Sequence, residues 1–432
     1  MAGVILVAVL TGAAIVLSPT EAGGLAALGT IFAVTYWRPD LGLSIWLLAT
    51  LFTPFWLRGQ IAGIAVFPSY LALPILIAAL LAGVRFRTRL GVADAAMFSG
   101  VVLVVVSHAM FHQATFLLTN VAITLLSGYV IGRMADPHSI GRTFRLSVLL
   151  IAAWGLLEFA TGLHLFSAIP PLEGIGPEIQ DRAGLARAEA SLGHAIAYGA
   201  TLTAALPWVL QRRRALLGVT TLCAGVVVSL SRGPMLSLVL TLMLFAYVRR
   251  SQTGRVKALL TLTVAGFVAY VVLTFLYSGS GEAELNSSSA ARNSQVGILA
   301  QLANWFGPAD GLHLIDGRYT ANGIGIVDST PLRLALDFGW VTCVLLLLPM
   351  AIAIIGTLRR ARSTAAIAVA GQLPVILVTS LITQWQTVLF FIAGLAMTEL
   401  AAGDSGTQAE SNRERSPADR ADARDDGVSR DA

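Results

Sequence analysis

Several arginines in this sequence are placed where they could bind a phosphate group. Arg187 comes shortly before an apolar run that opens with His194, and Arg232 lies in the turn Ser-Arg-Gly-Pro between two apolar runs. Arg318, and more weakly Arg292, lie in a polar stretch further along the chain. A guanidinium binds phosphate oxygens in pairs, so we predict that these arginines hold a diphosphate and stabilise charge on a leaving group. Alternatively, each arginine only reaches toward lipid head groups.

A second set of residues could take a proton from a hydroxyl group. We predict Asp328 as the catalytic base, with His194 as the less favoured candidate and His313 in support. Such a base must lie within hydrogen-bonding reach of the hydroxyl, about 2.6–3.2 Å. Asp328 precedes Ser329, which we count as a supporting residue, so Asp328 could instead cap the helix that follows. His194 could equally be an interfacial histidine.

Two carboxylates inside apolar runs complete the candidate set. Glu158 is a functional candidate because an intramembrane carboxylate is costly to place, although it could also be a structural partner for an arginine. Asp337 follows Arg333 by four residues, a spacing at which the two side chains can pair on a helix. The sequence contains no P-loop, HExxH or CxxC motif, and we expect neither a metal nor a cofactor.

The elements that position these residues are apolar runs of membrane length. The chain has 432 residues, of which 56% are hydrophobic and 12% charged, whereas soluble proteins are nearer half apolar and a quarter charged. Runs of about 17–25 apolar residues each can cross a bilayer as a helix. We therefore predict an all-α, polytopic transmembrane helix bundle of about 12–14 spans. The expected runs are 3–18, 22–37, 41–57, 66–84, 92–111, 115–134, 143–161, 194–211, 215–231, 234–249, 257–278, 332–357, 364–382 and 385–402.

The runs divide the chain into membrane segments and two long loops. Transmembrane helices are expected in 1–161, 194–278 and 332–402, extracytoplasmic loops in 162–193 and 279–331, and a disordered cytoplasmic tail in 403–432. Within the first loop, residues 177–193 have the charge pattern of an interfacial helix.

The arginines also predict the orientation. Most of them fall in alternate connections, which the positive-inside rule places in the cytoplasm together with both termini. Because these cations lie in short loops and form no continuous patch, we expect no nucleic-acid partner.

Three stretches resemble the O-antigen ligase and exopolysaccharide polymerase superfamily of bacterial membrane proteins. RAEASLGHAIAYGATLTAALP (187–207) is similar to the family's arginine and Gly-His pair at the start of a span, and VSLSRGPMLSLV (228–239) to its Ser-Arg-Gly turn. DSTPLRLALDFGWVT (328–342) resembles the ligase signature at Ser329, Gly339 and Thr342. The family's histidine position holds Asp328, which looks more like the polymerase branch.

The resemblance implies a metal-independent, inverting glycosyltransferase in the bacterial cytoplasmic (inner) membrane. Its donor would be a glycan on polyprenyl diphosphate, its acceptor a second glycan, and a chain-length regulator would be a further partner. One alternative is a ligase that transfers finished glycan to a lipid or protein. Others are a transporter or flippase of lipid-linked sugars, which would need charged residues deep in its spans, and a structural assembly subunit.

Overall fold

The computed structural model describes most of the chain between residues 19 and 414. The described residues are 19–54, 57, 59–61, 64–66, 68–113, 115–168, 181–182, 184–212, 215–248, 263, 266, 300–315, 318–321, 324–325, 329–380 and 383–414. The expected run 3–18, nearly all of 257–278 and the tail after 414 lie outside them.

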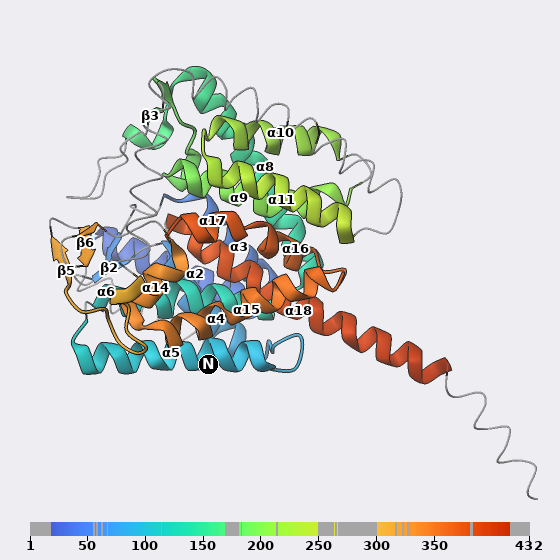
Figure 1. Ribbon diagram of the computed structural model, residues 1–432, viewed down its shortest axis with the longest axis horizontal. Coiled ribbons are helices and arrows are strands. Elements are labelled where there is room, and N and C mark those ends of the chain that lie inside the picture. The colour runs from blue at the N-terminus through green and yellow to red at the C-terminus, as the bar shows by residue number, and fades with distance from the viewer. Residues whose placement is uncertain are drawn as a thin grey trace, which may run out of the picture.

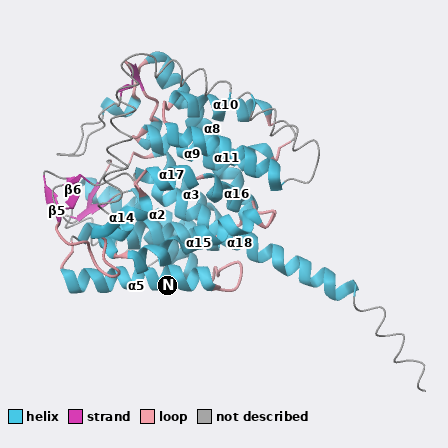
Figure 2. Ribbon diagram, viewed as in Figure 1, coloured by secondary structure: helices cyan, strands magenta, loops and turns pink. Residues whose placement is uncertain are grey.

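The described chain is a bundle of apolar helices, as predicted (Figures 1 and 2). Five helices are long and apolar enough to cross a membrane, and seven shorter apolar helices accompany them in the described residues. The helices are α2 (Pro19–Trp37), α3 (Pro39–Phe52), α4 (Ala72–Leu81), α5 (Val92–Phe111), α6 (Thr115–Thr119), α7 (Ser127–Met134), α8 (Pro137–Thr161), α9 (Ala195–Leu210), α10 (Leu216–Val228), α11 (Arg232–Val248), α14 (Thr330–Phe338), α15 (Trp340–Leu358), α16 (Thr364–Gly371), α17 (Leu373–Val378) and α18 (Thr383–Glu414).

Hydrogen bonds between distant connections sort the helix ends into two groups. At the first end, Gln384 at the start of α18 donates to the carbonyl of Thr53 after α3, and Ser191 before α9 donates to Leu51. At the second end, Glu399 of α18 accepts from Ser363 before α16. The end of α3, the segment before α9 and the start of α18 therefore lie together at the first end, and the start of α16 lies beside a later part of α18 at the second end. In Figure 1 the strands lie on the left and α18 leaves the bundle on the right.

Helices α7 and α18 approach each other at glycines. A Cβ atom at Gly132 would lie 2.1 Å from the carbonyl oxygen of Phe391, and one at Gly394 would lie 2.1 Å from that of Tyr129. Small residues let helix backbones come this close, and the close approach strengthens the van der Waals contacts between the two helices.

A buried ion pair joins α5 and α7 at the second end of the bundle. Arg133 Nε lies 2.7 Å from Asp94 Oδ1, and both side chains are at most 4% exposed. The same carboxylate accepts from the Tyr129 hydroxyl at 2.8 Å, and Arg133 also donates to Thr88 and Thr398. Because a buried charge is costly unless it is paired and hydrogen-bonded, this network accounts for both ionised groups without a ligand.

Two expected runs are interrupted in the structure. The run 332–357 is divided at Gly339 between α14 and α15, and the run 364–382 at Gln372 between α16 and α17. Gly339 adopts φ +90, and a Cβ atom there would lie 2.6 Å from the Cα of Phe306. The prediction of single helices was wrong at these two places, because an apolar run contains no signal for a break of one residue.

The loops contain short strands that the all-α prediction did not include. These are β1 (Gly59–Ile61) with β2 (Ile64–Val66), β3 (Asp181–Arg182) with β4 (Leu185–Ala186), and the antiparallel order β5 (Leu312–Ile315), β6 (Arg318–Ala321), β7 (Ile324–Gly325). The interfacial helix expected at 177–193 is not found in its described part, where β3 and β4 form a hairpin and η4 (Ala190–Leu192) is a 3-10 turn. Gly184 at φ +75 permits the turn between the strands.

Helix α18 extends past its expected end. It continues to Glu414 (Figure 1), although disorder was predicted from residue 403. This stretch contains Ala, Gln, Glu and Arg, which have good intrinsic helix propensity. The prediction of disorder was based on low hydrophobicity and did not take that propensity into account.

Candidate functional site

The candidate site is built around the segment that leads into α9. Glu158, near the end of α8, is 3% exposed. Its Oε2 accepts from the backbone nitrogens of Glu189 at 3.0 Å and Ala190 at 2.7 Å, and its Oε1 lies 3.1 Å from Nδ1 of His164. Glu158 therefore holds the segment 187–194 to the end of α8. We predicted either a functional carboxylate or a partner for an arginine, and the described contacts are with backbone N–H groups and a histidine.

Arg187 joins this segment to the turn between α10 and α11. Its Nε donates to the carbonyl of Ser229 at 3.0 Å, and a terminal nitrogen donates to the hydroxyl of Ser231. Arg182 adds a bond to the carbonyl of Leu230 at 2.9 Å. The side chain of Arg187 is 9% exposed. Two arginines thus brace the turn from which Arg232, half-buried, begins α11.

Backbone strain is concentrated at this end of the bundle. Ala190 has φ +47, Leu230 has φ +49 and Thr383 has φ +46, a region that residues with a Cβ atom rarely adopt. Ala190 donates its N–H to Glu158, and the carbonyl of Leu230 accepts from Arg182. Such strain costs about 1–3 kcal/mol per residue and is found most often at functional sites.

His194 occupies the N-cap of α9, just outside the helix. Its Nδ1 accepts from the backbone nitrogen of Ile196 at 3.1 Å, so the neutral ring carries its proton on Nε2. Burial, with the positive charge of Arg187 as the second cause, lowers the pKa of His194 to about 4. His194 is therefore neutral near pH 7 and suited to donate a hydrogen bond from Nε2. It is less suited to act as the base that we considered from the sequence.

The start of α14 packs near the Arg232 turn. A Cβ atom at Gly233 would lie 3.3 Å from Val378 Cγ2, and the next carbonyl, that of Thr379, accepts from Thr330 Oγ1 at 2.7 Å. Ser329 holds the N-cap position of α14, not Asp328 as one interpretation of the sequence had it. Through Val378 and Thr379, the start of α14 therefore lies close to the start of α11.

Arg333 pairs with Asp337 as the spacing predicted. Nε of Arg333 lies 2.7 Å from Oδ2 of Asp337. After this pair the helix is interrupted at Gly339, which separates α14 from α15. Thr342, in the first turn of α15, is fully buried. Arg333 therefore serves the stability of α14 through its carboxylate partner.

The structure brings together three of the predicted regions and leaves others untested. Glu158, Arg187, His194 and the Arg232 turn converge at one end of the bundle. Asp328 and Arg292 lie outside the described residues, and Arg318 and His313 are described only by their backbone, in β6 and β5. Among the residues that are described, no group of three His, Cys, Asp or Glu side chains could share a metal ion.

Several residues that shape this end were missed from the sequence. They are Arg182, Ser191, Ser229, Ser231 and Gln384, whose polar atoms hold the segments together. Only Arg182 carried a signal, as one of the arginines predicted to lie outside the cytoplasm. The other four act through hydrogen bonds to residues far away in the sequence, and spacing along the chain does not reveal those. Neither models of known protein families nor curated protein sequences give a match to this chain.

Proposed function

We propose that the protein is a membrane glycosyltransferase that polymerises polyprenyl-diphosphate-linked glycan repeat units. The reaction would take place on the outer face of the bacterial cytoplasmic membrane, with the arginine-rich connections inside. The observation that carries the proposal is the convergence of Glu158, Arg187, His194 and the Arg232 turn at the end of the bundle where the long loops lie. Membrane proteins usually carry fewer arginines and lysines on the outer side than in the cytoplasm. An anionic ligand that these cations bind would explain why they are present on the outer side.

The residues would divide the work as follows. Arg232 binds the diphosphate, and Arg187 holds the Arg232 turn in place while adding its charge. Arg318 and Arg292, which belong to the predicted loop 279–331, would add further positive charge. Positioned charges of this kind stabilise the charge that develops on the departing diphosphate.

The transfer step forms one bond and breaks one. The acceptor hydroxyl oxygen attacks the anomeric carbon from the face opposite the diphosphate, while the bond from that carbon to the diphosphate oxygen breaks. The diphosphate leaves with the electron pair, and the hydroxyl proton passes to Asp328. His194 would orient the acceptor through its Nε2 proton. The configuration at the anomeric carbon inverts.

The distribution of buried charge favours this enzyme over a transporter. Among the described residues, the buried charged side chains are Asp94, Arg133, Glu158, Arg187, Glu189 and Asp337. The first two lie at the second end and form a closed network, and the contacts place the other four toward the first end. A path for charged lipid-linked sugar would need such groups between the ends.

The test is the length of polymer in cells that carry Arg232→Ala. The loss of one charged hydrogen-bond donor should raise the activation free energy of transfer by roughly 1.5–3 kcal/mol. The rate then falls about 10- to 150-fold, and the cells make shorter polymer. Arg359→Ala, which removes the same charge at the opposite end of the bundle, is the matched control and should leave chain length unchanged. Normal chain length in Arg232→Ala at normal protein level would count against the proposal.

Purified components separate the remaining alternatives. With lipid-linked repeat units as the only substrate, a polymerase gives a ladder of products, whereas a ligase gives a single adduct on an added lipid or protein acceptor. Movement of labelled lipid-linked sugar across proteoliposomes, with no new glycosidic bond, would indicate a flippase instead.

A further inference from the structure

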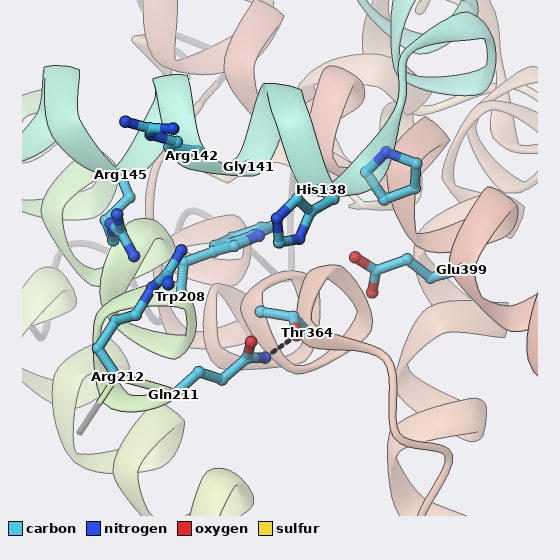
Figure 3. Close-up of a pocket in the computed structure, with 10 residues that line it drawn as sticks. His138, Gly141, Arg142, Arg145, Trp208, Gln211, Arg212, Thr364 and Glu399 are labelled. Atoms are coloured by element: carbon cyan, nitrogen blue, oxygen red, sulfur yellow. Dashed lines mark hydrogen bonds between the residues drawn. The ribbon is translucent and has the colours of Figure 1, made fainter.

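A cavity at the second end of the bundle is lined by cations from α8 and from the connection after α9. It has a volume of about 340 Å³, and its walls include His138, Arg142 and Arg145 of α8 and Arg212 after α9. In Figure 3 the side chains of Arg145 and Arg212 point toward each other, with His138 to one side. This end is opposite the glycan site proposed above.

These guanidiniums have no acidic partner in the described structure. Within the described ranges, none of the three arginines forms an ion pair or a side-chain hydrogen bond. Glu399 also lines the cavity, but Figure 3 places it across from Arg145 and Arg212. Its Oε2 is bound by Ser363 Oγ at 2.7 Å and Ala365 N at 3.0 Å. Like charges that converge in this way repel one another, and an anion between them would relieve the repulsion.

The floor of the cavity is rigid. Trp208 is 8% exposed and packs edge-on against Phe144, with ring centroids 5.4 Å apart. A Cβ atom at Gly141 would lie 2.5 Å from Trp208 Nε1, so glycine at this position lets the indole lie against α8. One wall of the cavity is therefore built from side chains packed between α8 and α9.

An apolar strip leads away from the cations along α8. Arg142, Leu146 and Leu150 follow at intervals of four and share one face of the helix, and the two leucines are 47% and 63% exposed. Leu216 and Leu217, at the start of α10, are 74% and 80% exposed. A molecule with a phosphate head and hydrocarbon chains would match both the cations and this strip.

We propose that this cavity binds the phosphate head group of an anionic membrane lipid, with its chains along α8. Guanidiniums recognise phosphate oxygens in pairs, and Arg142, Arg145 and Arg212 supply enough donors to surround one. The indole of Trp208 closes the cavity behind the head group. The proposal concerns lipid binding alone and does not depend on the proposed glycosyl transfer.

The experiment counts lipids bound to the purified full-length protein in detergent by native mass spectrometry, with phosphatidylglycerol as the probe and phosphatidylcholine as the uncharged comparison. The test variant is Arg142→Gln/Arg212→Gln, in which both residues are exposed, so folding is preserved. Each arginine near an anionic lipid contributes about fivefold in affinity, so the double variant should lose about 30-fold. The matched control Arg359→Gln/Arg362→Gln removes the same charge from exposed residues outside the cavity and should lose much less.

The possible outcomes each decide the proposal. A selective loss in the cavity variant, with weak binding of phosphatidylcholine, supports it. Equal losses in the two double variants would show only general attraction to surface charge and overturn it. Soluble glycerol phosphate provides the last comparison: if it displaces the lipid at equal concentration, the site takes a free phosphate ester and the lipid assignment is wrong.

Discussion

Glu158 offers the sharpest test of how the segment 187–194 is held in place. Substitution by alanine removes both carboxylate oxygens from a position that is 3% exposed. The backbone N–H groups of Glu189 and Ala190, which Glu158 Oε2 accepts at 3.0 and 2.7 Å, then lose their partner. We expect the segment 187–194 to loosen, and Arg187 to lose its fixed position with it.

The size of the effect follows from the number of bonds lost. A buried donor without a partner costs about 1–3 kcal/mol, so two of them lower the free energy of unfolding by roughly 2–6 kcal/mol. Glu158→Gln keeps an oxygen that can accept both N–H groups but removes the charge. A charged hydrogen bond exceeds a neutral one by about 1 kcal/mol, so the glutamine variant should lose only about 2 kcal/mol.

Two measurements check this order of stability. Denaturant unfolding in one fixed detergent should give parent, then Glu158→Gln, then Glu158→Ala in decreasing stability. Polymer length in cells should follow the same order, because Glu158 positions the site without touching the reacting atoms. The reasoning is refuted if the alanine variant unfolds within about 0.5 kcal/mol of the parent, the range of ordinary surface substitutions, or if the two variants are equally unstable.

Two further predictions concern Gly339 and His194. Gly339→Ala places a Cβ atom 2.6 Å from the Cα of Phe306 at φ +90 and should lower the free energy of unfolding by more than about 3 kcal/mol. Gly83→Ala, at φ +80 with no atom within 4 Å, is the control and should cost about 1 kcal/mol; equal losses would contradict the role given to the Phe306 contact. The pKa of His194 is about 4 in the fold against about 6.5 in the unfolded chain, so its contribution to stability is present above pH 6.5 and is lost as the pH falls toward 4. His194→Asn keeps a good N-cap residue and should unfold with a weaker dependence on pH between 7.5 and 4.5; a dependence identical to that of the parent would refute the assignment.

The sequence predicted most accurately those features that depend on neighbours along the chain. Helix α5 has the limits 92–111 that its apolar run indicated, and Arg333 pairs with Asp337 at the spacing of one helical turn. Both follow from the geometry of a single helix, which composition and spacing describe well.

Features that depend on distant contacts were not predicted. The charges of residues 177–193 resemble one face of a helix, yet in the described part Gly184 turns the chain and Arg187 donates to the carbonyl of Ser229 in another connection. The break at Gly339 depends on the backbone of Phe306 lying against it. Tertiary contacts of this kind override local preference, and a single sequence gives no direct indication of them.

The side-chain amide of Gln384 has a consequence for biosynthesis. It donates to Thr53 at 2.6 Å and to Ser191 at 3.1 Å, and so ties the beginning and middle of the polypeptide to its last helix. The first of these bonds joins residues 331 positions apart. During synthesis this end of the bundle stays unfinished until residue 384 has left the ribosome, because both bonds need its side chain. Ribosome-bound chains that stop before α18 should therefore be inactive, however well their first helices are integrated.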